Sequence, residues 1–489
     1  MEQNSGSSVT RLTEETKERF GLYYLATTLL LAWYYSLWFT PNIFVHSNLL
    51  SDNVTFSWLA TLAASGIAFL VLANLFNKID KRLYQMPSLM IVAGVVAAGA
   101  TASYTLWSNA VLNTVAALVV FPLLFGLSNA IIWIGLGEYH ARKKSSFSTH
   151  KFLGVFGIVM LASMLFTTIA PHIVAVAFVT LLPIASVVLY LYESKALGAT
   201  PLPTLLPTDT RKKTLKPTVI ISVTIFIGCA ACYYNIAIIP SDMLSPGSIW
   251  PDGMSYVIGI SCSALAAGVI AVCQATISKS IVTYRFLPWL LVVTVAAISL
   301  FVNGDPLLYP YSFIITVAIA GIFEVMLIGY FGTLSAKGFV ATAMAFGMSS
   351  AVVRLGFFFG DSVAVFYEQN PVLHEQLSTE TAIVFLCLLA ICLIPLMRQE
   401  SVILQLTTAP SKNNEVEEVC DAAIAEFALS RREGEILKLF ARGYTIDSIS
   451  KKLVISPYTT QTHVRHIYSK MHVHKRSELL DYINMHRTE

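Results

Sequence analysis

Long apolar runs separated by short polar segments make up the first four-fifths of the chain. A helix needs about 20 predominantly apolar residues to cross the hydrocarbon core of a bilayer. Backbone polar groups inside lipid must bond within their own segment, so runs of this length predict transmembrane helices. Twelve runs come close to that length, at residues 22–40, 56–76, 87–107, 111–137, 152–170, 172–192, 218–239, 255–277, 286–303, 308–331, 339–360 and 381–397.

Lysine and arginine fall on one side of these predicted spans. Basic residues in short connections mark the cytoplasmic side of a membrane protein. The N-terminal tail and the even-numbered connections carry 18 of the 19 basic residues among residues 1–397, and the odd-numbered connections carry none. One missed span would destroy this alternation, so the pattern supports twelve spans and predicts that both termini are cytoplasmic.

The longest cytoplasmic connection, 193–217, divides the spans into two halves of about 20–192 and 218–397. Two six-helix halves joined by such a linker resemble the major facilitator superfamily, in topology only. The resemblance implies that spans one, four, seven and ten line a central cavity. That family often carries Gly-x-x-x-Asp-Arg-x-Gly-Arg between spans two and three. Residues 76–82 keep Asp80 and a basic pair but lack the glycines, which weakens the case for active transport.

Composition separates the last fifth of the chain from the rest. Hydrophobic residues make up 55% of the chain and charged residues 12%, against about 25% charged in a soluble protein. Residues 398–489 nevertheless hold 13 of the 32 basic and 12 of the 29 acidic residues. The composition excludes a wholly water-soluble, disordered or coiled-coil chain. It predicts a membrane domain over 1–397 and a soluble end.

The soluble end has the pattern of a linker followed by a small helical domain. Residues 398–428 read as a linker with a short helix near its end, and residues 429–489 as a four-helix domain. Ser430-x-x-Glu433 is a capping box that begins the first helix. Ser456 followed by Pro457 begins the third helix, because serine caps and proline at the first position loses no hydrogen bond. In that third helix an inward stripe is predicted from the apolar spacing, at Thr460, Val464, Ile467 and Met471.

Two short helices joined by a brief turn, the second with polar and basic residues outward, are typical of a helix-turn-helix. Residues 429–487 hold eleven basic and five acidic residues. The chain resembles the LuxR-type DNA-binding domain at Leu429-Ser-Arg-Arg-Glu433, Gly443, Ile449, Leu453, Ile455-Ser456 and residues 459–470. Two positions depart from that family. Thr460-Gln461 stands where Val-Lys is usual, and His472 stands where a glycine is usual.

The resemblance implies specific DNA contacts. Base edges would be read by Gln461, Thr462 and Arg465, and glutamine and arginine can bond adenine and guanine bidentately. Phosphate contacts, which set register and salt dependence, would come from Lys451, Lys452, Thr459, His463, Lys470, Lys475 and Arg476. The family dimerises through its last helix, so Leu479, Leu480 and Ile483 are candidates for a homodimer contact on double-stranded DNA. The alternative is that these three apolar residues only pack in the hydrophobic core of the domain.

Charged groups inside membrane spans are costly and are candidates for function. Glu324 in span ten and Arg354 in span eleven could pair with each other, or Arg354 could bind an anionic group of a ligand. Further candidates for a ligand or switch role are Trp33, Asn129, Trp133 and Asn235. Tryptophan is also common at membrane–water interfaces, so Trp33 and Trp133 could instead be interfacial residues.

These features predict an all-α protein, a 6+6 transmembrane bundle followed by a LuxR-type domain. They favour a membrane-bound one-component transcriptional regulator, whose partners are double-stranded DNA, the lipid bilayer and an unidentified small-molecule effector. The alternative is a major-facilitator-like transporter with a regulatory DNA-binding tail. The sequence holds no metal cluster, phosphate loop or nucleophile constellation, so no cofactor or metal is expected and an enzyme has little support.

Overall fold

A computed structural model describes residues 22–43, 51–79, 82–107, 115–143, 148–198, 200–206, 208–244, 254–276, 283–407, 412–441 and 445–485. The chain divides into two compact units, Met1–Thr407 and Thr408–Glu489. Every regular element in these described ranges is a helix. Asp80 and Lys81 of the loop between spans two and three lie outside them.

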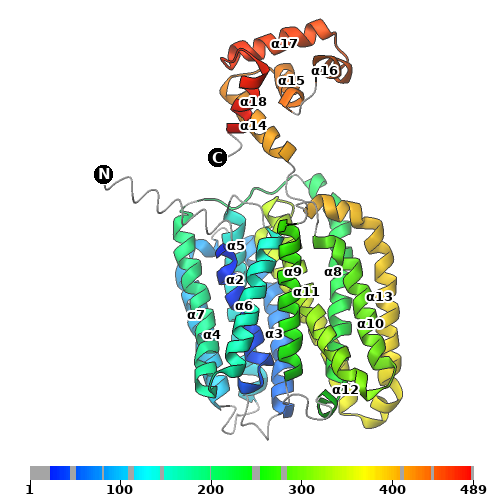
Figure 1. Ribbon diagram of the computed structural model, residues 1–489. Coiled ribbons are helices and arrows are strands. Elements are labelled where there is room, and N and C mark those ends of the chain that lie inside the picture. The colour runs from blue at the N-terminus through cyan, green and yellow to red at the C-terminus, as the bar shows by residue number, and fades with distance from the viewer. Residues whose placement is uncertain are drawn as a thin grey trace. The chain divides into compact units, whose positions relative to one another are not determined.

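The first unit is a bundle of long helices (Figure 1). Its twelve described α-helices are α2 (Leu25–Phe39), α3 (Ser51–Lys78), α4 (Pro87–Trp107), α5 (Phe121–Arg142), α6 (Thr149–Ile169), α7 (His172–Ala196), α8 (Thr208–Ile238), α9 (Met254–Thr276), α10 (Leu287–Val302), α11 (Tyr309–Ala336), α12 (Thr342–Glu368) and α13 (Pro371–Thr407). Each predicted span overlaps one of these helices, which confirms the all-α fold.

Eleven helices in the described ranges are long and apolar enough to cross a membrane. The exception among the predicted spans is α2, which has 15 residues and is preceded by a 3-10 turn, Leu22–Tyr24. Twelve of its residues are buried, so α2 is covered by its neighbours along most of its length. The first predicted span is therefore present as a helix but is the shortest of the twelve.

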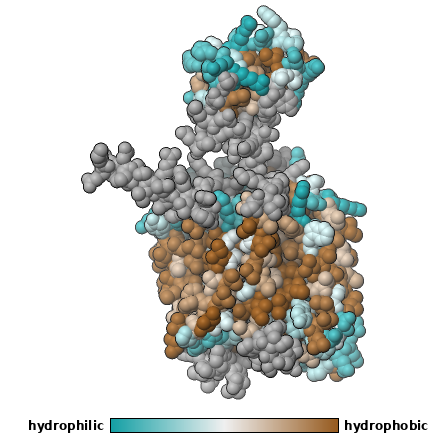
Figure 2. All heavy atoms as spheres, viewed as in Figure 1, coloured by the Kyte–Doolittle hydropathy of each residue, from teal (hydrophilic) through white to brown (hydrophobic). Residues whose placement is uncertain are grey.

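The outside of the first unit is apolar. The face shown in Figure 2 carries a broad band of hydrophobic side chains, with hydrophilic residues towards both ends. Large apolar side chains stand exposed on the first unit, among them Ile158, Ile173 and Trp289. A surface of this kind is stable against lipid tails and would be unfavourable in water. The first unit is therefore a multi-pass membrane domain.

The two halves of the bundle meet along two helix pairs, α12 with α3 and α6 with α9. A Cβ added at Gly157 of α6 would lie 2.6 Å from the Ala264 carbonyl oxygen of α9, so only glycine permits this approach. On the other pair, the Trp58 indole N–H of α3 donates to Asp361 Oδ2 of α12 at 2.8 Å. Packing and a buried hydrogen bond thus hold the halves together.

The linker between the halves is shorter than the predicted 193–217, because α7 continues to Ala196 and α8 begins at Thr208. Arg142 at the end of α5 donates to the carbonyl oxygens of Gly198 at 2.6 Å and Thr200 at 2.8 Å. At the other end of the linker, Leu206 N donates to Gly338 O at 3.0 Å. Both halves therefore hold this linker through backbone contacts.

The predicted boundary at 397 and the linker 398–428 also need correction. Helix α13 runs on to Thr407, and its last turn is held by Ile403, which is buried. The Lys337 ammonium donates to Leu406 O of this turn at 2.8 Å. A further helix, α14 (Lys412–Glu426), fills most of the remaining predicted linker. The connection between the two units is therefore much shorter than expected.

The second unit contains α14, α15 (Arg431–Ala441), α16 (Ile446–Leu453), α17 (Pro457–Lys470) and α18 (Arg476–Met485). The predicted capping box is present: Glu433 N donates to Ser430 Oγ at 3.3 Å, and Ser430 N donates to Glu433 Oε2 at 2.7 Å. The helices share one apolar core, to which α14 contributes Cys420 and Ala423. This unit thus carries a core of its own, with α14 added to the four predicted helices.

Candidate DNA-reading surface and buried membrane centre

Helix α17 has one buried face and one exposed face, as its sequence spacing predicts. Thr460, Val464 and Ile467 are buried, and Met471 just beyond the helix is buried too. This inward stripe orients the opposite face, where Gln461 and Arg465 are exposed and Thr462 is half-buried. Two predicted base-reading side chains are thus free to reach a partner. The Thr462 hydroxyl donates to Tyr458 O at 3.0 Å, which leaves mainly its methyl group for contact.

The turn before α17 is built by capping. Ser456 accepts a hydrogen bond from Thr459 N at 3.0 Å, and Pro457 occupies the first turn. Val454, the residue that follows α16, has a φ of 54° and is 89% exposed. A β-branched residue in the left-handed region is strained. This left-handed conformation of Val454 reverses the direction of the chain between α16 and α17, the two helices of the helix-turn-helix.

The seven predicted phosphate-contact residues fall into two groups. Lys451, Lys452, Thr459 and Lys475 are exposed, and His463 is half-buried with no partner for Nδ1 among the described residues. Of the exposed residues, Lys475 Nζ lies 3.7 Å from Glu478 Oε1 and Thr459 Oγ1 lies 2.7 Å from Ser456 Oγ. Lys470 and Arg476 make contacts that join different helices of the domain. Lys470 Nζ lies 2.7 Å from Glu433 Oε2, and the Arg476 guanidinium lies over the Phe440 ring at 4.7 Å. These last two stabilise the domain, whatever they contribute to DNA.

Glu433 is the acidic centre of these contacts. Burial opposes its ionisation, but the hydrogen bonds from Lys470 and Ser430 outweigh burial and lower its pKa to about 2. His466 Nδ1 lies 3.7 Å from the same carboxylate. Glu433 therefore joins the beginning of α15 to the end of α17, and it orients the recognition helix within the domain.

The predicted dimer residues are mostly in the core. Leu479 is 0% exposed and Ile483 is 2% exposed, so the structure gives them the alternative role of closing the bundle. Leu480 on α18 is half-buried and keeps some surface for a partner. Apolar spacing alone could not separate the two roles, because one stripe of α18 serves both.

The membrane unit contains a buried ion pair. Arg354 Nη2 of α12 lies 2.9 Å from Glu324 Oε1 of α11, and both side chains are almost fully buried. The Tyr35 hydroxyl of α2 donates to Glu324 Oε2 at 2.5 Å. The Tyr34 ring covers the guanidinium at 4.0 Å, a cation–π contact. The pair lies in the second half of the bundle and is contacted by side chains from the first.

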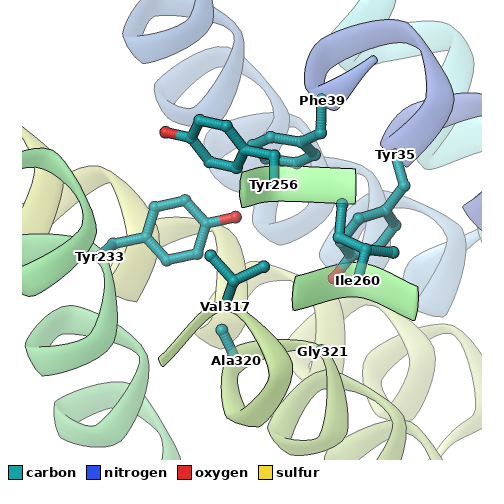
Figure 3. Close-up of a pocket in the computed structure, with 8 residues that line it drawn as sticks. All are labelled: Tyr35, Phe39, Tyr233, Tyr256, Ile260, Val317, Ala320 and Gly321. Atoms are coloured by element: carbon teal, nitrogen blue, oxygen red, sulfur yellow. The ribbon is translucent and has the colours of Figure 1, made fainter. Parts of the chain in front are cut away.

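Beside this pair lies a small cavity between the halves. Its walls are Tyr35 and Phe39 of α2, Tyr233 of α8, and residues of α9 and α11 (Figure 3). The Phe39 and Tyr256 rings stack with centroids 5.1 Å apart, and Tyr233 reaches into the space from the opposite side. The cavity volume is about 10 Å³, roughly the room that one water needs. The halves are closed around this point.

The other four membrane candidates do not join the ion pair. The Trp33 indole donates to Thr101 Oγ1 at 2.9 Å within the first half, and the Trp133 indole donates to Phe346 O at 3.1 Å across the halves. Asn235 donates to Ser312 Oγ at 2.9 Å. Asn129 is buried on α5. The two tryptophans thus tie helices together and are not an interfacial belt.

Comparison with known proteins identifies the second unit. Residues 428–483 match the family of bacterial regulatory proteins named luxR. The C-terminal unit is a LuxR-type DNA-binding domain. The chain is 36% identical over 69 residues to the oxygen regulatory protein NreC of Staphylococcus epidermidis, and 43% identical over 54 residues to NreC of Staphylococcus carnosus. These matches cover 14% and 11% of this chain, and 32% and 25% of the relatives.

A solved structure resembles the first unit. It is the crystal structure of a bacterial homologue of the iron transporter ferroportin in the outward-facing state, with a TM-score of 0.52 and 12% identity. The match covers 77% of this chain and 99% of that one. The likeness shows that the first unit shares the fold of that transporter. The chain spans about a third or less of the length of the regulatory relatives that it matches.

The backbone at His472 explains why glycine is usual at this position of LuxR-type domains. His472 has a φ of 54°, in the region where glycine is unstrained. The usual glycine of this family fits that conformation, and histidine adopts it at a cost. Val473 then returns the chain to the core, where it is partly buried.

Sequence reasoning missed Tyr458 on the DNA-reading face. This residue is 77% exposed in the first turn of α17. It precedes Gln461 and Thr462 by three and four positions and Arg465 by seven, so it lies on the same face. Residues near the N-terminus of a recognition helix contact base edges in this class of domain. The helical spacing was the signal that could have found it.

Proposed function

We propose that this chain is a membrane-bound one-component transcriptional regulator of the inner (cytoplasmic) membrane, with both termini in the cytoplasm. A small molecule bound by the membrane unit changes sequence-specific DNA binding by the LuxR-type domain. The alternation of basic residues along the connections supports the orientation. The fusion of a DNA-binding domain to a transporter fold supports the role, because the membrane unit then supplies the input.

The observation that carries the proposal is the contact between the turn after α11 and the end of α13. Helices α11 and α12 hold the buried pair of Glu324 and Arg354. The turn that joins them contains Lys337, which holds Leu406 O at 2.8 Å, and Gly338, which accepts from Leu206 of the inter-half linker. Helix α13 ends at Thr407 and α14 of the DNA-binding unit begins at Lys412. A shift of α11 or α12 would therefore move the last turn of α13, the end of the membrane unit.

On the DNA side, we assign base reading to Gln461, Thr462 and Arg465, and phosphate contact first to the exposed residues Lys451, Lys452, Thr459 and Lys475. The protein would bind as a homodimer, with Leu480 as the remaining contact candidate on α18. A two-fold dimer reads a two-fold site. Sites selected from random DNA by fragment 408–489 are therefore expected to be inverted repeats.

The test places such a selected site upstream of a reporter gene in cells that contain the full-length chain. We expect the membrane-bound protein to occupy the site and to respond to some members of a compound library. Fragment 408–489 should occupy the site without responding. Arg465→Ala should lower occupancy, and Arg285→Met, at an exposed position of the membrane unit, should leave it unchanged. A full-length chain that never occupies the site in cells would rule the proposal out.

The transporter fold favours a second candidate, a transporter with a regulatory DNA-binding tail. Uptake by the purified chain in liposomes separates the two. Saturable uptake of a compound that leaves reporter output unchanged would favour the transporter. A change in output without uptake would favour the sensor.

A further inference from the structure

The buried centre of the membrane unit has more hydrogen-bond donors than acceptors. A guanidinium carries five N–H groups and no acceptor. Arg354 is 2% exposed, and only its Nη2 reaches Glu324. Its Nε and Nη1 have no partner among the described residues. Buried donors without partners are rare and costly, so a centre of this kind calls for an acceptor.

Two hydroxyl groups of the first half lie beyond the ring that covers Arg354. The Tyr34 hydroxyl, at the far end of that ring, lies beside Ser65, which is 0% exposed. Each hydroxyl can both donate and accept, so these two can satisfy one another. The unmet donors of the centre are therefore the N–H groups of Arg354.

The internal carboxylate does not reach Nε or Nη1 of Arg354. Glu324 Oε2 accepts from Tyr35, and Glu324 Oε1 lies 2.9 Å from Arg354 Nη2 but has no hydrogen-bond partner among the described residues. A cationic ligand would meet the positive charge of Arg354 and a carboxylate that is already neutralised. An anion with two oxygens matches the fork of a guanidinium. The chemistry therefore favours a carboxylate.

The adjoining cavity is apolar, and Tyr35 connects it to the ion pair. The Tyr35 ring lines the cavity, and its hydroxyl bonds Glu324. Phe39, Tyr233 and Val317 supply much of the remaining wall (Figure 3). At about 10 Å³ the space is too small for an organic molecule. Because its walls come from α2 of one half and α8, α9 and α11 of the other, a ligand enters only by separating the halves.

We propose that Arg354 is the binding site for the carboxylate of a small effector with an apolar body, which displaces Glu324 from the guanidinium and fills the space beside Tyr35 and Tyr233. The effect of this binding on DNA occupancy rests on the proposed regulatory function, because separation of the halves would shift α11 and α12. The acid comes from water or, as a fatty acid, from the bilayer.

The test uses the full-length chain in uncharged lipid nanodiscs and measures tryptophan fluorescence, because the Trp58 and Tyr34 rings lie 5.6 Å apart. The probes are benzoate, hexanoate and dodecanoate, each compared with its primary amide. We expect a saturable change with at least one carboxylate and with none of the amides. Benzoate or hexanoate would indicate a source in water, and dodecanoate alone a source in the bilayer.

Two variants separate a binding site from a structural pair. Glu324→Gln removes the internal competitor, so it should tighten carboxylate binding by about tenfold. Glu324→Gln combined with Arg354→Met removes both charges, which avoids an unpaired buried charge, and should weaken binding at least about tenfold below the single variant. Arg285→Met, which removes an exposed arginine, should bind as the original chain does. Thermal unfolding checks that each variant is folded.

Several results would overturn the anion site: equal binding of acids and amides, no saturable change with any probe, or equal binding by the single and double variants. Weaker binding by Glu324→Gln would show that the pair is structural only. The same experiments distinguish the carboxylate site from the regulatory function. If carboxylates bind as expected but DNA occupancy does not change, the site is supported and the regulatory function is refuted. If DNA occupancy responds equally in the double variant, the regulatory function is supported and the carboxylate site is refuted.

Discussion

Replacing Glu433 should test how the LuxR-type domain holds its recognition helix. Glu433 closes the capping box with Ser430 and pairs with Lys470 at 2.7 Å. Glutamine in its place keeps a capping box, which accepts Glu or Gln, but loses the charge. Alanine loses both. Comparing the two variants therefore separates the ion pair from the cap.

The magnitude follows from the pKa. A fall from 4.5 to about 2 corresponds to a ceiling of roughly 3 kcal/mol at about 1.4 kcal/mol per unit. The Lys470 side chain is 40% exposed, so solvent screening reduces this to about 1–2 kcal/mol. Glu433→Gln should lower the free energy of unfolding by that amount at pH 7. Glu433→Ala should cost about 1 kcal/mol more through the lost cap.

The effect should depend on pH with a definite sign. The pKa of Glu433 is lower in the folded state than its ordinary value of 4.5. Its stabilisation is therefore complete above about pH 4.5 and is lost as the pH falls towards 2. The original domain and Glu433→Gln should converge in stability over that window.

The assay is urea unfolding of fragment 408–489, followed by circular dichroism at pH 7 and near pH 3. Lys470→Met and the double variant with Glu433→Gln complete a cycle, in which the coupling free energy should be about 1 kcal/mol. A difference between the original domain and Glu433→Gln that is absent at pH 7, or unchanged near pH 3, would refute the reasoning.

Three further predictions concern DNA contact, backbone strain and the tether. Arg465→Ala should cost about 1–3 kcal/mol of specific binding and relax base preference, while Lys451→Ala weakens all DNA alike; gel shifts that leave Arg465→Ala unchanged contradict the assignment. His472→Gly should stabilise fragment 408–489 by about 0.5–1 kcal/mol, because glycine accepts the left-handed conformation; an unchanged urea midpoint argues against strain. Lys337→Met should speed hydrogen exchange in residues 403–407 about threefold or more through the lost bond to Leu406; unchanged exchange rules out a holding role.

Much of the fold could be predicted because its signals are local. Twelve apolar runs gave twelve helices, since lipid leaves the backbone no other partner. The predicted ends failed where polar residues continue a helix. Residues 398–407 look like a linker but extend α13, because Ile403 is buried and Lys337 holds the last turn. These are tertiary contacts, and no local pattern encodes them.

The candidate sites divide in the same way. On α17 the apolar spacing predicted the buried face correctly, because a straight helix carries that spacing directly to its surface. On α18 the same reasoning could not decide between core and dimer, and the structure buries Leu479 and Ile483. In the membrane the two charges were visible from the sequence, but their pairing was one of two open alternatives.

The sequence by itself determined the membrane and soluble parts, the helical class, the LuxR-type domain and the presence of two charges within the spans. Only the tertiary structure decided that Glu324 and Arg354 meet, that Tyr34 and Tyr35 close over them, and that three N–H groups of the arginine stay without partners among the described residues. The physical reason is the separation along the sequence over which each interaction acts. Burial in lipid and helical spacing act over neighbouring residues, whereas Tyr35 and Glu324 lie 289 positions apart and meet only when the two halves pack.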